Sequence, residues 1–195
     1  NLFQPIKIGE VELKNRIVML ALTTGYGEPD ESVGDRLISF FDERARGGAG
    51  LILVPFSPVR AGSPIEPGLY DDRFIPGARR LTAKIHSSGA KIAAQLLTSY
   101  HAIFGAGVAE LVGPSPVMNQ LLRSVPRPLT TDEIHFVVEE YGAAARRARE
   151  AGFDAVEIMA GAGYLLNRFL SPITNKRVDE YGGSLENRMR IILEV

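Results

Sequence analysis

The chain has 195 residues, of which 45% are hydrophobic and 23% charged, the composition of an ordinary globular domain. Its formal net charge is -1 and acidic and basic residues alternate, so nothing in the charge favours nucleic acid or an anionic membrane as a partner. The absence of cysteine excludes disulfides, thiolate metal sites and a cysteine nucleophile within these residues, and it favours a cytoplasmic location. No apolar run approaches the roughly 20 residues that a membrane span needs, and the first residues do not read as a signal peptide.

The start of the sequence predicts a small hairpin, then a strand, a loop and a helix. Residues 5–14 alternate apolar and polar side chains around Gly9, which indicates a β-hairpin. Residues 16–22 are a continuous apolar run with the length of a buried parallel strand. After a Gly- and Pro-bearing loop, we expect Ser32 to help cap a helix whose inner face carries Leu37, Ile38, Phe41 and Ala45.

This strand, loop and helix unit repeats along the chain. Further buried strands are predicted at residues 50–56, 91–97 and 154–159, with a helix within residues 71–89. Residues 98–129 are rich in Gly and Pro, and a connection of that length usually carries function. The helix that follows is expected to open with a capping box at Thr130 and Glu133 and to face inward with Ile134, Val137, Val138, Tyr141, Ala144, Ala145 and Ala148.

Strands that alternate with helices in this way predict an α/β fold with a parallel sheet covered by helices. Two architectures fit the pattern. An open doubly wound sheet can be formed by four or five strands, whereas a (β/α)₈ barrel needs eight strands and typically about 250 residues. The residue pattern alone leaves both open.

The segment from Phe153 to Arg188, FDAVEIMAGAGYLLNRFLSPITNKRVDEYGGSLENR, places many polar residues beside a predicted strand end. It resembles the old yellow enzyme family of FMN-dependent reductases, and the resemblance continues in family order through LFQPIKIG, RARGGAGLIL, DDRFIPG and KIAAQL. The resemblance implies the amino-terminal half of a (β/α)₈ TIM barrel, with four parallel strands and their helices behind the hairpin, as a single incomplete domain over residues 1–195. Because the chain does not begin with methionine, we also expect it to begin inside a longer one.

The resemblance further implies FMN as cofactor, NADH or NADPH as electron donor, and hydride transfer to an unsaturated carbonyl, a thioester or another acceptor. Ala21, Leu22 and Thr23 would lie beside the flavin ring, with the Thr23 hydroxyl on a flavin carbonyl. Gln95 would hold the pyrimidine edge of the ring, because a carboxamide offers one donor and one acceptor side by side. Phe56 stands where relatives have a small residue, so the flavin pocket is either reshaped or partly blocked there. Without the resemblance, Thr23 is equally well explained as a turn residue and Gln95 as an interior amide.

For the reaction itself, the resemblance implies that Tyr164 donates a proton to the α-carbon of the acceptor; packing of the turn by this side chain is the alternative. Relatives bind the substrate carbonyl with a His-x-x-His or His-x-x-Asn pair, whose places are taken here by Met159 and Ala162. Neither can donate a hydrogen bond, and each lost oxyanion donor commonly costs about 2.7 to 4 kcal/mol in the barrier. Ordinary enone reduction should therefore be nearly silent unless another group substitutes, while residues 171–188 are expected to be mostly architectural.

The sequence shows no metal-ligand spacing and no dinucleotide fingerprint. As partners we expect a small-molecule substrate and a second copy of the chain, but neither nucleic acid nor membrane. The alternative is a non-catalytic or degenerate barrel fragment that acts as an oligomeric structural or binding module, because a sheet with open edges and half-covered apolar faces tends to associate. A third possibility is an intact α/β domain that binds another small ligand at its strand ends.

Overall fold

The computed structural model describes residues 1–62, 65–105 and 107–195. The chain forms two compact units, each built from segments that are distant in the sequence. Unit 1 comprises residues 1–57, 63–96 and 144–158. Unit 2 comprises residues 58–62, 97–143 and 159–195.

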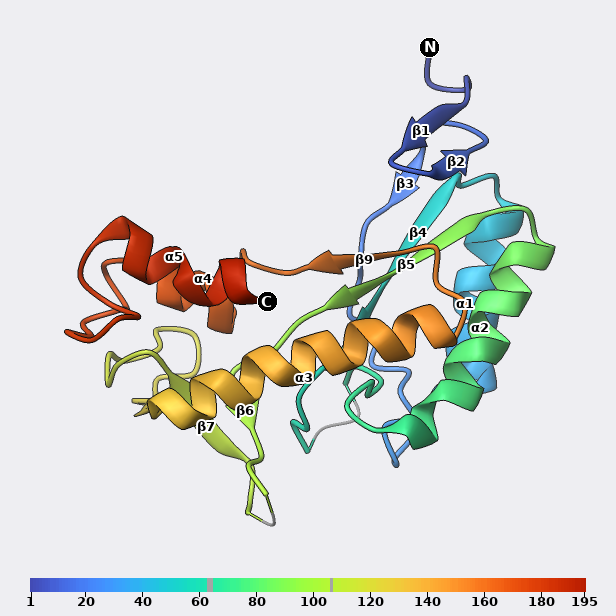
Figure 1. Cartoon of the computed structure of the whole chain (residues 1–195). Helices are drawn as coiled ribbons and strands as arrows, with labels where there is room; N and C mark the ends of the chain where they lie inside the picture. The colour runs from blue at the N-terminus through green and yellow to red at the C-terminus, as the bar shows by residue number, and fades with distance from the viewer. Residues whose placement is uncertain (63–64, 106) are drawn as a thin grey trace. The chain divides into compact units, whose positions relative to one another are not determined.

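A parallel sheet of four strands, in the order β3-β4-β5-β9, is the centre of unit 1 (Figure 1). The strands are β3 (Val18–Met19), β4 (Leu51–Phe56), β5 (Lys91–Leu96) and β9 (Ala155–Ile158). Every neighbouring pair is parallel, which confirms the four parallel strands predicted from the sequence. The predicted first strand is shorter than expected, because only Val18 and Met19 pair with β4.

The register of the sheet decides which side chains share a face. Phe56 pairs with Leu96, and Gln95 lies between Pro55 and Glu157 on the neighbouring strands. Because successive side chains of a strand point to opposite faces, Phe56 and Gln95 belong to different faces of the sheet. The face that carries Phe56 forms the core, where Ile52, Val54, Ile92, Ala94 and Leu96 are fully buried.

Helices α1 (Asp35–Arg46) and α2 (Ile75–Ser87) lie side by side, with the short 3₁₀ helix η1 (Asp72–Phe74) before α2 (Figure 1). The expectation that Ser32 caps α1 is wrong. The N-cap is Gly34, and Ser32 donates its backbone N–H to Asp30 in the preceding turn. A Cβ on Gly34 would overlap the end of the Glu28 side chain, which is flexible and can move aside, so this contact alone does not require glycine there. The predicted inner faces are confirmed, since the following side chains are buried: Leu37, Ile38, Phe41, Ala45, Ala78, Leu81 and Ile85.

Asp154, the residue before β9, contacts both the end of α2 and the start of β5. Its carboxylate accepts hydrogen bonds from Lys91 Nζ (2.8 Å) and the Ile92 backbone N–H (2.9 Å), and it lies 2.7 Å from His86 Nε2. Burial opposes its ionisation, but these partners together hold the pKa of Asp154 below its ordinary value. Strand β9 therefore starts at a fixed position beside β5.

The hairpin predicted at the start of the chain is confirmed. Strands β1 (Ile6–Ile8) and β2 (Val11–Leu13) are antiparallel and are joined through Gly9, whose φ of 57° is a conformation that suits glycine.

Unit 2 contains the carboxyl-terminal helices and the Gly- and Pro-rich segment. That segment is not only loop, because it forms a small sheet of β6 (His101–Ala102), β7 (Glu110–Gly113) and β8 (Arg127–Pro128). Helix α3 (Thr131–Glu150) follows, and its predicted capping box is confirmed: Thr130 N–H donates to Glu133 (2.9 Å) and Glu133 N–H to Thr130 Oγ1 (3.2 Å). Residues 131–143 of α3 belong to unit 2 and residues 144–150 to unit 1. Helices α4 (Leu165–Leu170) and α5 (Leu185–Glu194) are also in unit 2.

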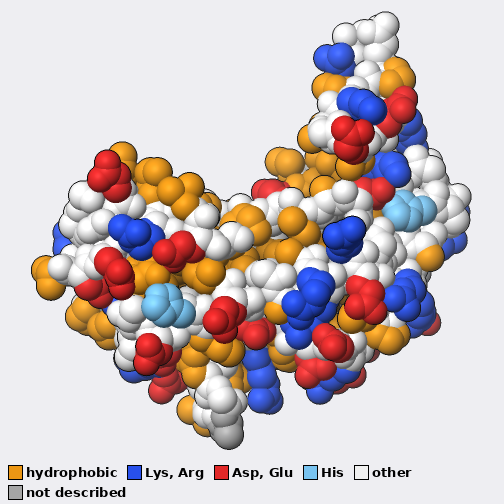
Figure 2. Space-filling view, in the orientation of Figure 1, with side chains coloured by type: hydrophobic (Ala, Val, Ile, Leu, Met, Phe, Trp, Pro, Cys, Tyr) orange, Lys and Arg blue, Asp and Glu red, His pale blue; other side chains and the backbone are white. Residues whose placement is uncertain are grey.

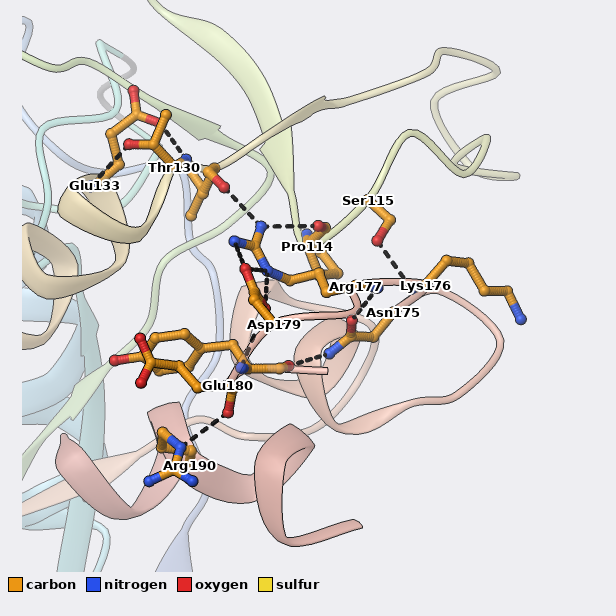
Figure 3. Close-up of polar contacts among 12 residues, drawn as sticks. Pro114, Ser115, Thr130, Glu133, Asn175, Lys176, Arg177, Asp179, Glu180 and Arg190 are labelled. Carbon is orange, nitrogen blue, oxygen red and sulfur yellow. Dashed lines mark hydrogen bonds and ion pairs between the residues drawn. The ribbon is translucent and has the colours of Figure 1, made fainter. Parts of the chain in front are cut away.

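Arg177 makes several of the contacts that hold the loop between α4 and α5 (Figure 3). Arg177 donates to the carbonyl oxygens of Leu129 (2.6 Å) and Pro114 (3.2 Å) and pairs with Asp179 (2.5 Å). Asn175, which is buried, donates to the carbonyl oxygens of Phe169 and Tyr181 at 2.7 Å each. These contacts satisfy backbone groups that a long loop would otherwise leave unpaired, which agrees with the architectural role expected for residues 171–188.

Acidic and basic side chains are interspersed over the face shown in Figure 2. Among the described residues, no helix is both long and apolar enough to cross a lipid bilayer.

Candidate functional site

The clearest polar arrangement in unit 1 joins the adjacent strands β5 and β9. Gln95 and Glu157 are register partners, and Gln95 Nε2 lies 3.3 Å from each carboxylate oxygen of Glu157. The carboxylate only accepts hydrogen bonds, so it turns the amide nitrogen of Gln95 toward itself. The carbonyl oxygen Oε1 of Gln95 has no hydrogen-bond partner among the described residues and is left as an acceptor.

This arrangement fits the pyrimidine edge of a flavin. That edge presents an N–H group between two carbonyl oxygens, and Gln95 offers the matching acceptor and a second amide N–H. The half-buried Gln95 comes one residue before the end of β5, and the carboxyl ends of parallel strands are where α/β folds place ligand groups. Gln95 and Glu157 are therefore suited to hold such a group.

Thr23, the second expected flavin ligand, lies in the segment after β3. Its hydroxyl donates to Glu66 Oε1 at 2.8 Å. Burial raises the pKa of the Glu66 carboxyl, and the bond from Thr23 opposes this shift. Donation from Thr23 to a flavin carbonyl would require it to release Glu66. Of the neighbouring expected ligands, Ala21 is half-buried and Leu22 is 51% exposed.

Phe56 does not project from the face that carries Gln95. Its ring is fully buried and packs edge-on against Phe153, with the ring centroids 5.4 Å apart. Pro55 is the β4 residue beside Gln95. Any contact of Phe56 with a ligand on the Gln95 face would therefore be made by its backbone.

Tyr164, the expected proton donor, is the N-cap residue of α4 in unit 2. The turn before it is fixed by the Gly163 N–H, which donates to Asn167 Oδ1 at 3.0 Å. The half-buried Tyr164 ring lies beside Tyr100, at a centroid distance of 5.8 Å and an angle of 40°. The role of Tyr164 as a proton donor stays a prediction.

The two expected substrate-contacting residues flank the same turn. Met159 is half-buried, and Ala162 is exposed with a φ of 54°, a left-handed conformation that is uncommon for alanine. Neither side chain carries a hydrogen-bond donor. The turn thus presents Tyr164 without the pair of donors that the family resemblance leads one to expect.

The structure brings Gln95 together with Glu157, and Thr23 together with Glu66. The convergence of Thr23 and Gln95 with Tyr164 stays a prediction, because Tyr164 belongs to unit 2. Sequence reasoning did not assign roles to the two carboxylates. Glu157 was visible as the single acid within an apolar strand, whereas nothing in the sequence singles out Glu66. No cluster of three or more histidine, aspartate or glutamate residues suited to a metal is found in the part of the chain that the structure describes.

Comparison with known families decides the class of the protein. The model of the NADH:flavin oxidoreductase / NADH oxidase family matches residues 1–195. The chain belongs to this family. Among curated members, the metal reductase of Desulforamulus reducens is 47% identical over 197 residues, which cover all of this chain and 29% of that protein.

Solved structures of the family agree with the fold. A 2-naphthoyl-CoA reductase complex matches with a TM-score of 0.92 and 34% identity, over all of this chain and 32% of that one. The Old Yellow Enzyme from Pichia sp. AKU4542 matches with a TM-score of 0.87 and 31% identity, over all of this chain and 54% of that one. The resemblance to the old yellow enzymes is thus confirmed, and the β/α units are part of a TIM barrel. The chain spans about a third to a half of the length of these relatives.

Proposed function

We propose that this chain is part of an FMN-dependent oxidoreductase that takes electrons from NADH or NADPH and reduces a small organic acceptor. The family match and the fit of Gln95 and Glu157 to a flavin edge support this proposal. When bound, FMN would supply the hydride chemistry, accepting hydride from the nicotinamide and delivering it to the acceptor. The protein supplies binding, orientation and proton transfer.

In this proposal Glu157 orients Gln95, and Gln95 holds the pyrimidine edge of the cofactor. Thr23 alternates between Glu66 and the cofactor, so Glu66 keeps the hydroxyl satisfied while no ligand is bound. Ala21, Leu22 and the backbone of Phe56 form the neighbouring wall.

Tyr164 donates the proton that completes reduction of the acceptor. Its phenol is neutral near pH 7 and donates when negative charge develops on the acceptor carbon. Met159 and Ala162 contact the acceptor but cannot donate hydrogen bonds to it. Acceptors whose carbonyl group needs strong activation should therefore react slowly. An unsaturated carbonyl, a thioester or another acceptor activated elsewhere in the protein fits this arrangement.

The observation that carries the proposal is the Gln95–Glu157 pair, and Gln95→Leu tests it. The complete protein, once purified, should be yellow, and mass spectrometry of the released chromophore should identify FMN. Replacement of Gln95 by leucine removes hydrogen bonds next to a carboxylate and should weaken flavin binding by about ten- to a hundredfold. Gln4→Leu, at an exposed position, is the matched control and should retain its flavin. Equal flavin affinity in the two variants would remove Gln95 from the site.

A second candidate, an oligomeric structural module without catalysis, is favoured by one observation. Apolar side chains of the β3 strand and the segment after it are exposed at Val18 (38%), Leu20 (73%) and Leu22 (51%). Such a row is suited to contact another polypeptide. A colourless protein that forms dimers or larger assemblies would support this candidate over the flavoenzyme. A cytoplasmic location and homo-oligomerisation stay predictions in either case.

A further inference from the structure

Unit 2 contains a cavity of about 310 Å³, within the range of sites that bind small molecules. Its wall is mostly apolar and includes Pro114, Val117, Met118, Leu121, Pro126 and Ile173. Met118, Leu121 and Ile173 are also exposed to solvent, at 51%, 76% and 73%, so the apolar wall continues to the surface. A hydrocarbon group can enter the cavity from solvent and be covered there.

One charged side chain, Arg168 of α4, lies in this apolar wall. It is only 6% exposed, and its Nε and Nη1 atoms are buried without a hydrogen-bond partner among the described residues. Its Nη2 makes a long contact of 3.4 Å to the Ser99 carbonyl oxygen. Arg168 forms no ion pair with any described carboxylate, and burial lowers the pKa of its guanidinium to about 10, opposed only by Tyr100.

A buried cation without a counter-charge is strongly unfavourable, and proteins usually pair such groups. The Tyr100 ring compensates in part, because the guanidinium carbon lies 5.3 Å from its centroid. The N–H groups of Nε and Nη1 still need acceptors. An anionic ligand would neutralise this charge. Because Nε and Nη1 are themselves covered, such a ligand would bond to them only after a small shift of the guanidinium toward the cavity.

We propose that this cavity binds the carboxylate of a small organic acid, with Arg168 as its counter-charge and the apolar wall around its hydrocarbon part. A planar carboxylate matches the guanidinium fork. Inorganic anions fit less well, because the wall offers them a single cation and mostly carbon. The inference does not require the flavin chemistry proposed above.

The site would lie one helical turn from Tyr164. The backbone N–H of Arg168 donates to the backbone carbonyl oxygen of Tyr164 at 3.0 Å. The Tyr100 ring contacts both the Arg168 guanidinium and the Tyr164 ring. The cavity also includes Gly163, which precedes Tyr164. An acid held by Arg168 would therefore lie beside the turn that positions the expected proton donor.

Titration calorimetry with benzoate and benzamide tests the inference, since the two probes share a ring and differ in charge. Benzoate should bind the purified protein saturably, with one molecule per chain, and at least tenfold more tightly than benzamide or inorganic phosphate. Arg168→Gln should weaken benzoate binding at least tenfold and leave benzamide binding unchanged. Arg168→Lys keeps the charge without the guanidinium fork, so its benzoate affinity should lie between those of the unaltered protein and Arg168→Gln. Arg149→Gln, at an exposed position on α3, is the matched control and should bind benzoate like the unaltered protein.

Thermal unfolding of the same samples separates a lost site from a lost fold. Benzoate should raise the melting temperature of the unaltered protein and of Arg149→Gln but not of Arg168→Gln. Failure of benzoate to bind the unaltered protein, equal affinity for benzoate and benzamide, or tighter binding of phosphate would each overturn the inference. So would unchanged benzoate affinity in Arg168→Gln; should that variant not fold, the comparison of probes on the unaltered protein and on Arg168→Lys decides. Flavin absorbance recorded on each sample tests the proposed function separately.

Discussion

Gln95 Nε2 lies 3.3 Å from both carboxylate oxygens of Glu157, across two adjacent parallel strands. This contact ties the orientation of the amide to a charged neighbour on the same face of the sheet. A side-chain amide otherwise rotates freely and presents either its oxygen or its nitrogen to a ligand. In this protein the oxygen is the atom left open.

Removal of Glu157 should therefore weaken flavin binding even though Glu157 need not touch the flavin. In Glu157→Ala the Gln95 amide loses a charge-assisted partner, and we expect flavin affinity to fall by about tenfold. The control is Glu139→Ala, an exposed acid on α3. Dissociation constants from flavin fluorescence quenching measure the effect. A lower flavin affinity in Glu157→Ala but not in Glu139→Ala supports the orienting role of Glu157. Identical flavin affinities in the two variants would refute it.

Replacement of Tyr164 by phenylalanine should slow only the second half of the proposed cycle. The variant keeps the ring beside Tyr100 but loses the transferable proton, and general acids typically contribute about 10² to 10⁴-fold. Stopped-flow measurements should show flavin reduction by NADPH or NADH at the original rate and reoxidation by the acceptor slowed by at least about 100-fold. Tyr26→Phe serves as the control. Slowing of both half-reactions to the same extent would exclude Tyr164 from proton transfer.

Introduction of hydrogen-bond donors at the turn before Tyr164 should increase activity toward simple enones. Ala162 has a φ of 54°, and asparagine is among the residues that best tolerate this conformation. The double change Met159→His with Ala162→Asn should raise the rate of cyclohexenone reduction by about 100-fold or more, because single oxyanion donors commonly contribute that much. Each single change is its own control and should give a smaller gain. No gain in the double variant would mean that the acceptor does not lie at this turn.

Stability at low pH should depend on Asp154. Folding lowers the pKa of Asp154, so its stabilising effect is fully present above the pKa of an unfolded aspartate, about 3.9, and is lost as the pH falls through the lower folded value. Asp154→Asn should reduce the free energy of unfolding by about 1 to 3 kcal/mol at neutral pH. The difference in the free energy of unfolding between Asp154→Asn and the unaltered protein should shrink below about pH 3. Urea unfolding at a series of pH values from neutral to below about 3 measures this difference, with Glu12→Gln, at an exposed position, as control. A difference that stays constant with pH would contradict the assignment.

The capping box of α3 should contribute measurably to stability. Thr130→Ala removes the acceptor of the Glu133 N–H and should lower the free energy of unfolding by about 1 kcal/mol. Thr130→Ser keeps the oxygen and should restore most of the loss. Thr131→Ala, one residue into the helix, is the positional control. Equal losses at both positions would indicate a general effect of threonine rather than of the cap.

The repeating part of the fold could be predicted from the sequence because its signals are local. Helical spacing located the buried faces of α1 and α2 and most of that of α3, where Val138 and Ala145 are only half-buried. The Thr130–Glu133 spacing located a cap. The start of α1 was misassigned because Ser32 has the chemistry of a cap, whereas in the structure its backbone N–H donates to Asp30 in the turn before the helix. Strands β6, β7 and β8 were missed because they are very short and their pairing leaves little local pattern.

Individual residues of the candidate site could be predicted from the sequence, but their contacts with distant residues could not. Family resemblance pointed to Gln95, but its pairing with Glu157 depends on the register of two strands, which only the folded sheet fixes. The concern that Phe56 fills the flavin face came from its size, whereas the register assigns its ring to the opposite face. Burial of Arg168 without a carboxylate partner is also a property of the folded unit, since it depends on residues that are distant in the sequence.

The contacts of Arg177 have a practical consequence for handling the protein. The loop between α4 and α5 contains lysine and arginine, which trypsin cleaves, yet Arg177 binds the Leu129 and Pro114 carbonyl oxygens and its side chain is only 10% exposed. A protease must free several residues of backbone before it can cut. Limited digestion should therefore spare the bond after Arg177 until unit 2 opens, so the first cut there would report on local unfolding.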